Sequence, residues 1–123
     1  MHTPTKSYRD LIVWQKAILL VTEIYKLTRK FPSKEVYALA SQMQRAAVSI
    51  PSNIAEGRSR STAKDFVHFL HMALGSATEL ETQLIISENL EYIDASDKER
   101  ANALLSEVCR MLHGMIQKLE AGS

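Results

Sequence analysis

Four side chains of the kinds that bind metal ions lie in the second half of the chain: His68, His71, Cys109 and His113. If the segments around them form antiparallel helices, the first two lie roughly level with the last two, which raises the question of a zinc site. Helical wheels argue against one, because all four residues fall outside the apolar stripes that would face the core. We therefore expect neither a metal ion nor a cofactor, and we expect these side chains to lie on the surface.

Serine, amide and carboxylate groups recur along one flank of residues 33–56, at Ser49, Asn53 and Glu56. Such groups occur in hydrolases, but a serine nucleophile needs a base, and no histidine lies close to them in sequence. We expect them instead, together with Gly57, to have structural roles. The polar groups would hydrogen-bond across a close contact between helices.

Two classes of helical enzyme fail on spacing. A di-iron bundle needs two inward-facing Glu-x-x-His motifs, and Asp65 with His68 is only a near match to one of them. Helical-bundle ribonucleases place an arginine and a histidine at a set spacing, which Arg110 and His113 miss. Arg60 and His68 miss it too. The expectation is a protein that is not an enzyme.

Basic side chains are concentrated in the first half of the chain. Residues 1–64 hold 11 basic and 4 acidic side chains, whereas residues 65–123 hold 4 and 10. Arg58 and Arg60 lie in a Gly-Arg-Ser-Arg-Ser segment, whose charge and hydroxyl groups suit contacts with phosphates. Nearby carboxylates would neutralise part of this charge, so an ordinary solvated surface is the alternative. The residues expected to contact nucleic acid are Arg45, Arg58, Arg60 and Lys64, supported by Lys6 and Arg9.

The pattern of apolar residues predicts four helices and no strand. The composition agrees, with 46% hydrophobic and 24% charged residues and only 4 glycines and 3 prolines among 123 residues. Apolar residues recur at three- and four-residue steps, as in amphipathic helices. The expected helices span residues 10–30, 33–56, 62–90 and 97–120 of a single domain, residues 1–123.

Residues that typically begin, bend or end helices define these bounds. Ser33 is a candidate N-cap for the second helix, and Ser96 with Glu99 forms a capping box for the fourth. Gly57 offers a left-handed cap at the end of the second helix. Pro51 lacks a backbone donor, so we expect a kink, or a break with a restart, just before it.

Short connections of about three to seven residues make neighbouring helices antiparallel, which predicts an all-α, up-down-up-down four-helix bundle. The first helix has a second apolar stripe beside its expected core stripe, and a bundle has no central helix to bury both. We therefore expect the second stripe to form the interface of a homo-oligomer, although half-covered surface residues are the alternative. The expected core stripe is Leu11, Trp14, Ala17, Ile18, Val21 and Tyr25, and the expected interface is Val13, Leu20 and Leu27.

The expected location is the cytoplasm. The chain has 1 cysteine, which cannot form an internal disulfide, and no apolar run approaches the length of a membrane span. Residues 1–6 are polar and lack the apolar segment of a signal peptide. We expect no contact with a membrane.

The segment Tyr-Ala-Leu-Ala-Ser-Gln-Met-Gln-Arg-Ala-Ala-Val-Ser-Ile-Pro-Ser-Asn-Ile-Ala-Glu-Gly-Arg-Ser-Arg, residues 37–60, resembles the signature of a known four-helix-bundle family. This family is named for the 23S ribosomal RNA intervening-sequence protein. The likeness extends to residues 10–17, to Phe31-Pro32 and to residues 73–81. The accessory variability protein of diversity-generating retroelements is a similar protein. Gln44 stands where members often carry an arginine, which lowers the positive charge beside Arg45.

The resemblance implies a ring of five bundles and the binding of nucleic acid. The expected function is therefore that of a non-enzymatic homo-oligomer that binds nucleic acid, with RNA as the leading candidate ligand and DNA left open. The alternative is a scaffold that docks a protein partner, at the acidic end of the bundle or on the first helix, without nucleic acid. RNA binding that weakens with salt would separate the two.

Overall fold

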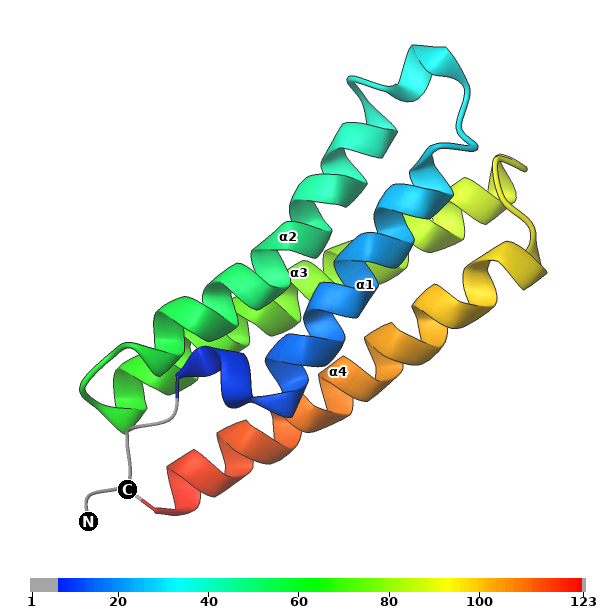
Figure 1. Ribbon diagram of the computed structural model, residues 1–123. Coiled ribbons are helices and arrows are strands. Elements are labelled where there is room, and N and C mark those ends of the chain that lie inside the picture. Colours follow the sequence, from blue (N-terminus) through cyan, green and yellow to red (C-terminus); the bar gives the residue numbers. More distant parts are fainter. Residues whose placement is uncertain (1–6, 123) are drawn as a thin grey trace.

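The computed structural model describes residues 7–122, which form helices and no strands. None of the helices in this range is both long and apolar enough to cross a membrane. Neighbouring α-helices run antiparallel (Figure 1), which confirms the predicted four-helix bundle. In chain order the elements are the short 3₁₀ helix η1 (Tyr8–Asp10), α1 (Ile12–Thr28), the 3₁₀ helix η2 (Ser33–Glu35), α2 (Leu39–Arg58), α3 (Ala63–Asn89) and α4 (Ala95–Ala121).

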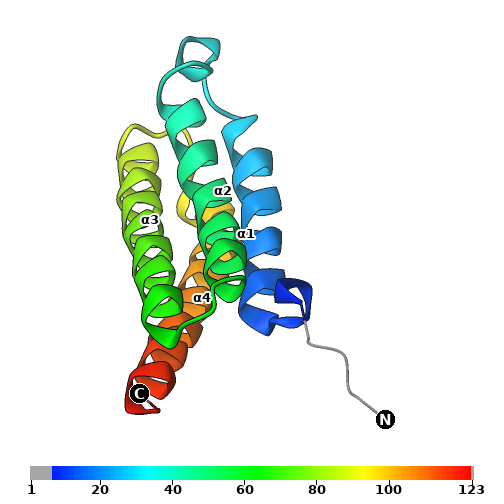
Figure 2. The same ribbon diagram turned by 90° about the vertical axis from the view of Figure 1, so that its left-hand side faces the viewer.

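The four helices enclose one apolar core. Each helix contacts its two neighbours in the order α1, α2, α3, α4 and back to α1, and the diagonal pairs do not meet. The contact between α2 and α3 is the most extensive, and the two helices lie side by side in Figure 2. Alanines on the buried faces of both helices allow their backbones to approach closely. At this contact the Ser76 hydroxyl donates a hydrogen bond of 2.8 Å to Ser49 Oγ.

The core-facing side of α1 differs from the prediction. Val13, Leu20 and Leu27 are 1%, 0% and 4% exposed within a single chain, packed among the other helices. They have no surface left to offer to a second subunit, so their assignment to an oligomer interface is wrong. The buried face of α1 is completed by Ala17 and Ile24.

Charged residues lie on the side of α1 that faces α4, which fits the observed rotation of α1 about its axis. Lys16, Glu23 and Lys30 recur at steps of seven and face α4, where each meets a residue of opposite charge. The stripe beside this charged side, which includes Val13, Leu20 and Leu27, faces the core. The pairs are Lys16 with Glu107 at 3.2 Å, Glu23 with Arg100 at 2.6 Å, and Lys30 with Asp97.

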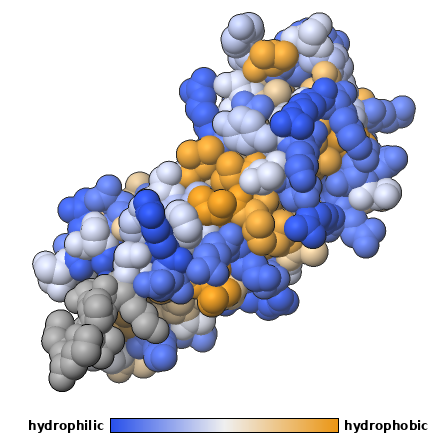
Figure 3. All heavy atoms as spheres, viewed as in Figure 1, coloured by the Kyte–Doolittle hydropathy of each residue, from blue (hydrophilic) through white to orange (hydrophobic). Residues whose placement is uncertain are grey.

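The stripe predicted for the core is only partly buried: Ala17 lies in the core, Leu11, Trp14 and Val21 are half-buried against it, and the other two residues are exposed. Ile18 is 39% and Tyr25 is 42% exposed, and Val48 of α2, beside them, is 41% exposed. Figure 3 shows apolar side chains gathered at the centre of this face, over α1 and α2. We call this region the α1–α2 apolar surface; it consists of Trp14, Ile18, Val21, Tyr25 and Val48.

The ends of α2 also differ from the prediction. Ser33 begins η2 rather than an α-helix, and α2 starts six residues later at Leu39. Its first turn is capped by the Glu35 carboxylate, which accepts a 3.3 Å hydrogen bond from the Leu39 amide. At the other end Gly57 is helical and has no positive φ, so it is not the predicted left-handed cap, and α2 continues to Arg58.

Two further helix signals were partly misassigned. The N-cap of α4 is Asp94, which forms a capping box with Asp97 through hydrogen bonds of 2.8 and 3.1 Å. Ser96 and Glu99 have the same spacing but lie inside the helix, so their assignment as the box is wrong. Pro51 causes no break, because α2 is continuous from Leu39 to Arg58 with the proline inside it.

Candidate nucleic-acid interface

Most of the predicted phosphate-binding residues lie at one end of the bundle. At this end α1 begins, α2 ends, α3 begins and α4 ends (Figure 1). We call it the basic end. Among the described residues it carries the cations Arg9, Arg58, Arg60, Lys64 and Lys118, together with the carboxylates Asp10, Glu56, Asp65 and Glu120.

The turn between α2 and α3 is tight because its backbone groups are used in hydrogen bonds. The Ser59 amide donates to the carbonyls of Ala55 and Glu56, and the Arg60 amide donates to that of Gly57 at 3.1 Å. The Ser59 hydroxyl donates to the Glu56 carbonyl at 2.7 Å, so it serves the end of the helix and is not free for a phosphate. The turn therefore holds its basic residues on a defined backbone.

Arg60 is positioned by two contacts. Its Nη2 lies 2.9 Å from Glu56 Oε2, and its guanidinium carbon lies 4.7 Å from the centre of the Phe69 ring. The arginine is thus held against the start of α3 with part of its side chain exposed. Lys64, in the first turn of α3, is exposed and forms no ion pair with any residue in the described range.

Gly57 makes this arrangement sterically possible. A Cβ atom at this position would lie 2.8 Å from the Phe69 Cβ and 2.9 Å from Cδ1 of Phe66. Only a glycine lets the start of α3 pack this closely on the end of α2. The sequence singled out Gly57 as structural, but the reason is close packing and not a left-handed backbone.

The other predicted residues are placed less uniformly. Arg9 is exposed at the basic end, and its guanidinium lies 5.9 Å from the centre of the Tyr8 ring. Arg58 is half-buried. Arg45 is 13 residues before Arg58 on α2, about 20 Å along the helix, and hydrogen-bonds to Ser41, so it does not join the basic end. Lys6 lies outside the described residues.

The candidate metal-binding residues separate into two places. His68 and His71 are exposed on α3, whereas Cys109 and His113 line a groove between α3 and α4. Nowhere in residues 7–122 do three or more His, Cys, Asp or Glu side chains gather closely enough to hold a metal ion. Burial, and secondarily the charge of Glu81, raises the pKa of the Cys109 thiol above its ordinary value. Glu81 was not singled out from the sequence, because one glutamate on a helix gives no signal of a groove.

The sequence profile of the family described as 23S rRNA-intervening sequence protein matches residues 9–114 of the chain. The chain belongs to this family. The matched range extends from η1 through most of α4, so the 23S rRNA-intervening sequence protein family accounts for all four helices of the fold.

A crystal structure shares this fold. It is that of a protein of unknown function from the S23 ribosomal protein family, from Bacteroides thetaiotaomicron, and it is similar to this chain with a TM-score of 0.77 and 27% sequence identity. The alignment covers 85% of this chain and 98% of the Bacteroides chain. No curated protein sequence matches the chain significantly.

Proposed function

We propose that this member of the family is a non-enzymatic, oligomeric protein that binds RNA through the basic end of the bundle. The observation that carries the proposal is the placement of Arg58, Arg60 and Lys64 around one rigid turn between α2 and α3. Cations gathered on one turn suit the closely spaced phosphates of a nucleic acid.

The family descriptions support RNA as the ligand. The description of the matched family refers to an intervening sequence of 23S rRNA, and the similar Bacteroides protein is assigned to a ribosomal protein family. The carboxylates at the basic end limit the affinity for RNA. Glu56 already pairs with Arg60, so a phosphate would share the Arg60 guanidinium with Glu56. We therefore expect weak binding that depends strongly on salt.

The α1–α2 apolar surface supports self-association. Exposed apolar residues that are contiguous on a surface are typical of subunit interfaces. Ile18, Tyr25 and Val48 are each about two-fifths exposed and adjoin two shallow apolar hollows on this face. This surface replaces Val13, Leu20 and Leu27 as the proposed contact between copies, in the ring of five that the family resemblance implies.

The RNA-binding proposal is tested by replacing Arg58 and Arg60 together with alanine. Binding of a mixed single-stranded RNA pool is measured by fluorescence anisotropy between about 50 and 200 mM salt. Loss of two phosphate contacts should weaken binding and reduce the slope of log affinity against log salt by about 1.4, at about 0.7 for each phosphate.

The matched control replaces Lys26 and Arg29 with alanine, which removes the same charge from exposed positions near the end of α1, at the opposite end of the bundle. This variant should keep the slope of the unaltered protein. If the two double variants change RNA binding equally, the effect is one of net charge and the basic end is not the site.

A protein-interaction scaffold is the second candidate function, because the α1–α2 apolar surface suits a different protein partner as well as a second copy of the chain. Light scattering with and without the RNA pool separates the two candidates. An assembly whose mass shifts with RNA only at low salt supports RNA binding. An assembly of the same mass that is indifferent to RNA at every salt concentration favours the scaffold.

A further inference from the structure

A groove of about 550 Å³ runs between α3 and α4, away from the basic end's turn and from the α1–α2 apolar surface. It exists because small side chains face each other where the two helices pass, among them Ala77 of α3 with Ser106 and Cys109 of α4. Larger side chains at these positions would fill the space between the helices. The groove is therefore built into the packing of α3 on α4.

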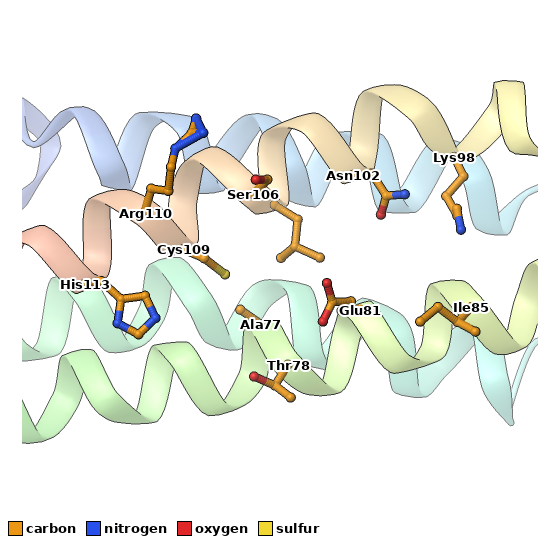
Figure 4. Close-up of a pocket in the computed structure, with 11 residues that line it drawn as sticks. Ala77, Thr78, Glu81, Ile85, Lys98, Asn102, Ser106, Cys109, Arg110 and His113 are labelled. Atoms are coloured by element: carbon orange, nitrogen blue, oxygen red, sulfur yellow. The ribbon is translucent and has the colours of Figure 1, made fainter.

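Polar side chains enter this groove from both helices. Figure 4 shows Glu81 reaching from α3 toward α4, while Cys109 and His113 reach from α4 toward α3. Among residues 7–122 no side chain forms an ion pair or a hydrogen bond with the carboxylate of Glu81. The groove thus presents an anionic acceptor at its centre whose hydrogen-bonding capacity is unused within the chain.

The two ends of the groove differ in charge. At one end Lys98 is neutralised by an ion pair with Glu88. At the other end His113 reaches toward α3, whereas the Arg110 side chain points away from α3 (Figure 4), and neither residue forms an ion pair within the described range. His113 is one helical turn beyond Cys109, about 6 Å along α4 and toward the basic end. A ligand that fits must offer hydrogen-bond donors at the centre and a negative charge at the His113 end.

We propose that this groove binds the guanine of an unpaired RNA nucleotide, with Glu81 hydrogen-bonding to the base and His113 contacting the adjoining phosphate. The Watson–Crick edge of guanine carries two neighbouring donors, N1–H and the N2 amino group, which match the two oxygens of one carboxylate. Each of the other three bases has a hydrogen-bond acceptor in one of these positions. That acceptor would repel the carboxylate oxygen opposite it. Asn102, on the α4 side of the groove, supplies an amide donor suited to guanine O6.

This inference rests on the proposed function, because the His113 end of the groove lies on the side of the basic end, where the strand would bind. The shared chemistry is that of a guanine nucleotide, which could also be free in solution. Two probes distinguish these sources: 5′-GMP, and single-stranded uridine 12-mers with and without one central guanosine.

Binding of GMP is measured by NMR on isotope-labelled protein. GMP should shift the amide signals of residues 77–85 and 98–113, and inosine monophosphate, which lacks the N2 amino group, should bind about tenfold more weakly. Glu81→Gln should remove this preference, because an amide cannot accept two hydrogen bonds on the same side. Glu99→Gln, which removes an exposed carboxylate outside the groove, should leave it intact. Equal affinity for GMP, inosine monophosphate and AMP would overturn the inference.

The 12-mers separate this inference from the proposed function. The unaltered protein should bind the guanosine-containing 12-mer about tenfold more tightly than the uridine 12-mer, and Glu81→Gln should make the two equal. Equal binding of both RNAs by the unaltered protein overturns the guanine site and leaves RNA binding in place. GMP binding without binding of either 12-mer overturns the RNA proposal and limits the groove to free nucleotides.

Discussion

Gly57 has a structural role in both the sequence prediction and the structure, but for different reasons. Its missing side chain lets Phe66 and Phe69 approach the end of α2, and Phe69 in turn lies under the guanidinium of Arg60. Gly75, on α3, offers a contrast within the same molecule, because a Cβ added there would meet nothing within 4 Å. Substituting the two glycines therefore distinguishes the effect of close packing, at Gly57, from that of helix propensity, at Gly75.

We predict that Gly57→Ala destabilises the protein by about 1–3 kcal/mol, because the clash with Phe69 exceeds the gain in helix propensity. Gly75→Ala should stabilise it by about 0.5–1 kcal/mol through propensity alone. Chemical denaturation gives both free energies of unfolding. If both variants were equally stabilised, α3 would shift without cost and Gly57 would not be a packing requirement.

At the scale of elements, one carboxylate links η2 to the connection between α3 and α4, at the end of the bundle away from the basic end. Glu35 accepts a 2.7 Å hydrogen bond from the Tyr92 hydroxyl and a second from the Leu39 amide. These two bonds lower the pKa of Glu35 below its ordinary value of 4.5, with the Tyr92 bond as the larger cause. One side chain thus joins η2, the start of α2 and the connection between α3 and α4.

This connection predicts a pH dependence. Because the folded protein lowers the pKa of Glu35, ionised Glu35 stabilises the fold above pH 4.5, and this stabilisation is lost as the pH falls through the lowered value. Tyr92→Phe removes the hydroxyl but keeps the aromatic ring, whose centre lies 5.2 Å from the centre of the Phe31 ring. The difference in unfolding free energy between the protein and this variant should shrink between pH 7 and pH 3. A constant difference would show that ionisation of Glu35 does not contribute.

The number of helices and their antiparallel order were predictable from the sequence, because four apolar stripes of period 3.6 and short connections leave few alternatives. The rotation of α1 was not. Apolar residues cover most of its circumference, so two stripes fit a core equally well by periodicity. One distinguishing feature is that Lys16, Glu23 and Lys30 match residues of opposite charge on α4, and this match is visible only when both helices are compared.

The candidate sites were predictable to different degrees. Arg58 and Arg60 are close in sequence and follow a helix end, so their proximity required no knowledge of the tertiary fold. The α3–α4 groove was not predictable, because Glu81 and His113 come from different helices and meet only through the register of their packing. That register is set by side-chain volumes along the whole contact, which a motif search does not evaluate.

For the whole molecule, the α1–α2 apolar surface predicts the state of assembly. Ile18→Glu places a charge on this surface at a residue that is 39% exposed, so the bundle should fold while contacts between copies are lost. Light scattering should give the mass of a larger assembly for the unaltered protein and of a monomer for the variant. Gln117→Glu adds the same charge to an exposed position near the end of α4 and should leave the mass unchanged. An unchanged mass for Ile18→Glu would place the interface elsewhere.

The ion pairs between α1 and α4 link the first helix of the chain to the last, with Glu23 and Arg100 separated by 77 residues. While the chain is being synthesised, α1, α2 and α3 can pair as soon as they have left the ribosome, but the contact between α1 and α4 forms only after α4 has been made. Until then the buried stripe of α1 is covered on one side only. Translation that stops before α4 therefore yields a product with an open apolar seam, which chaperones or proteases would recognise.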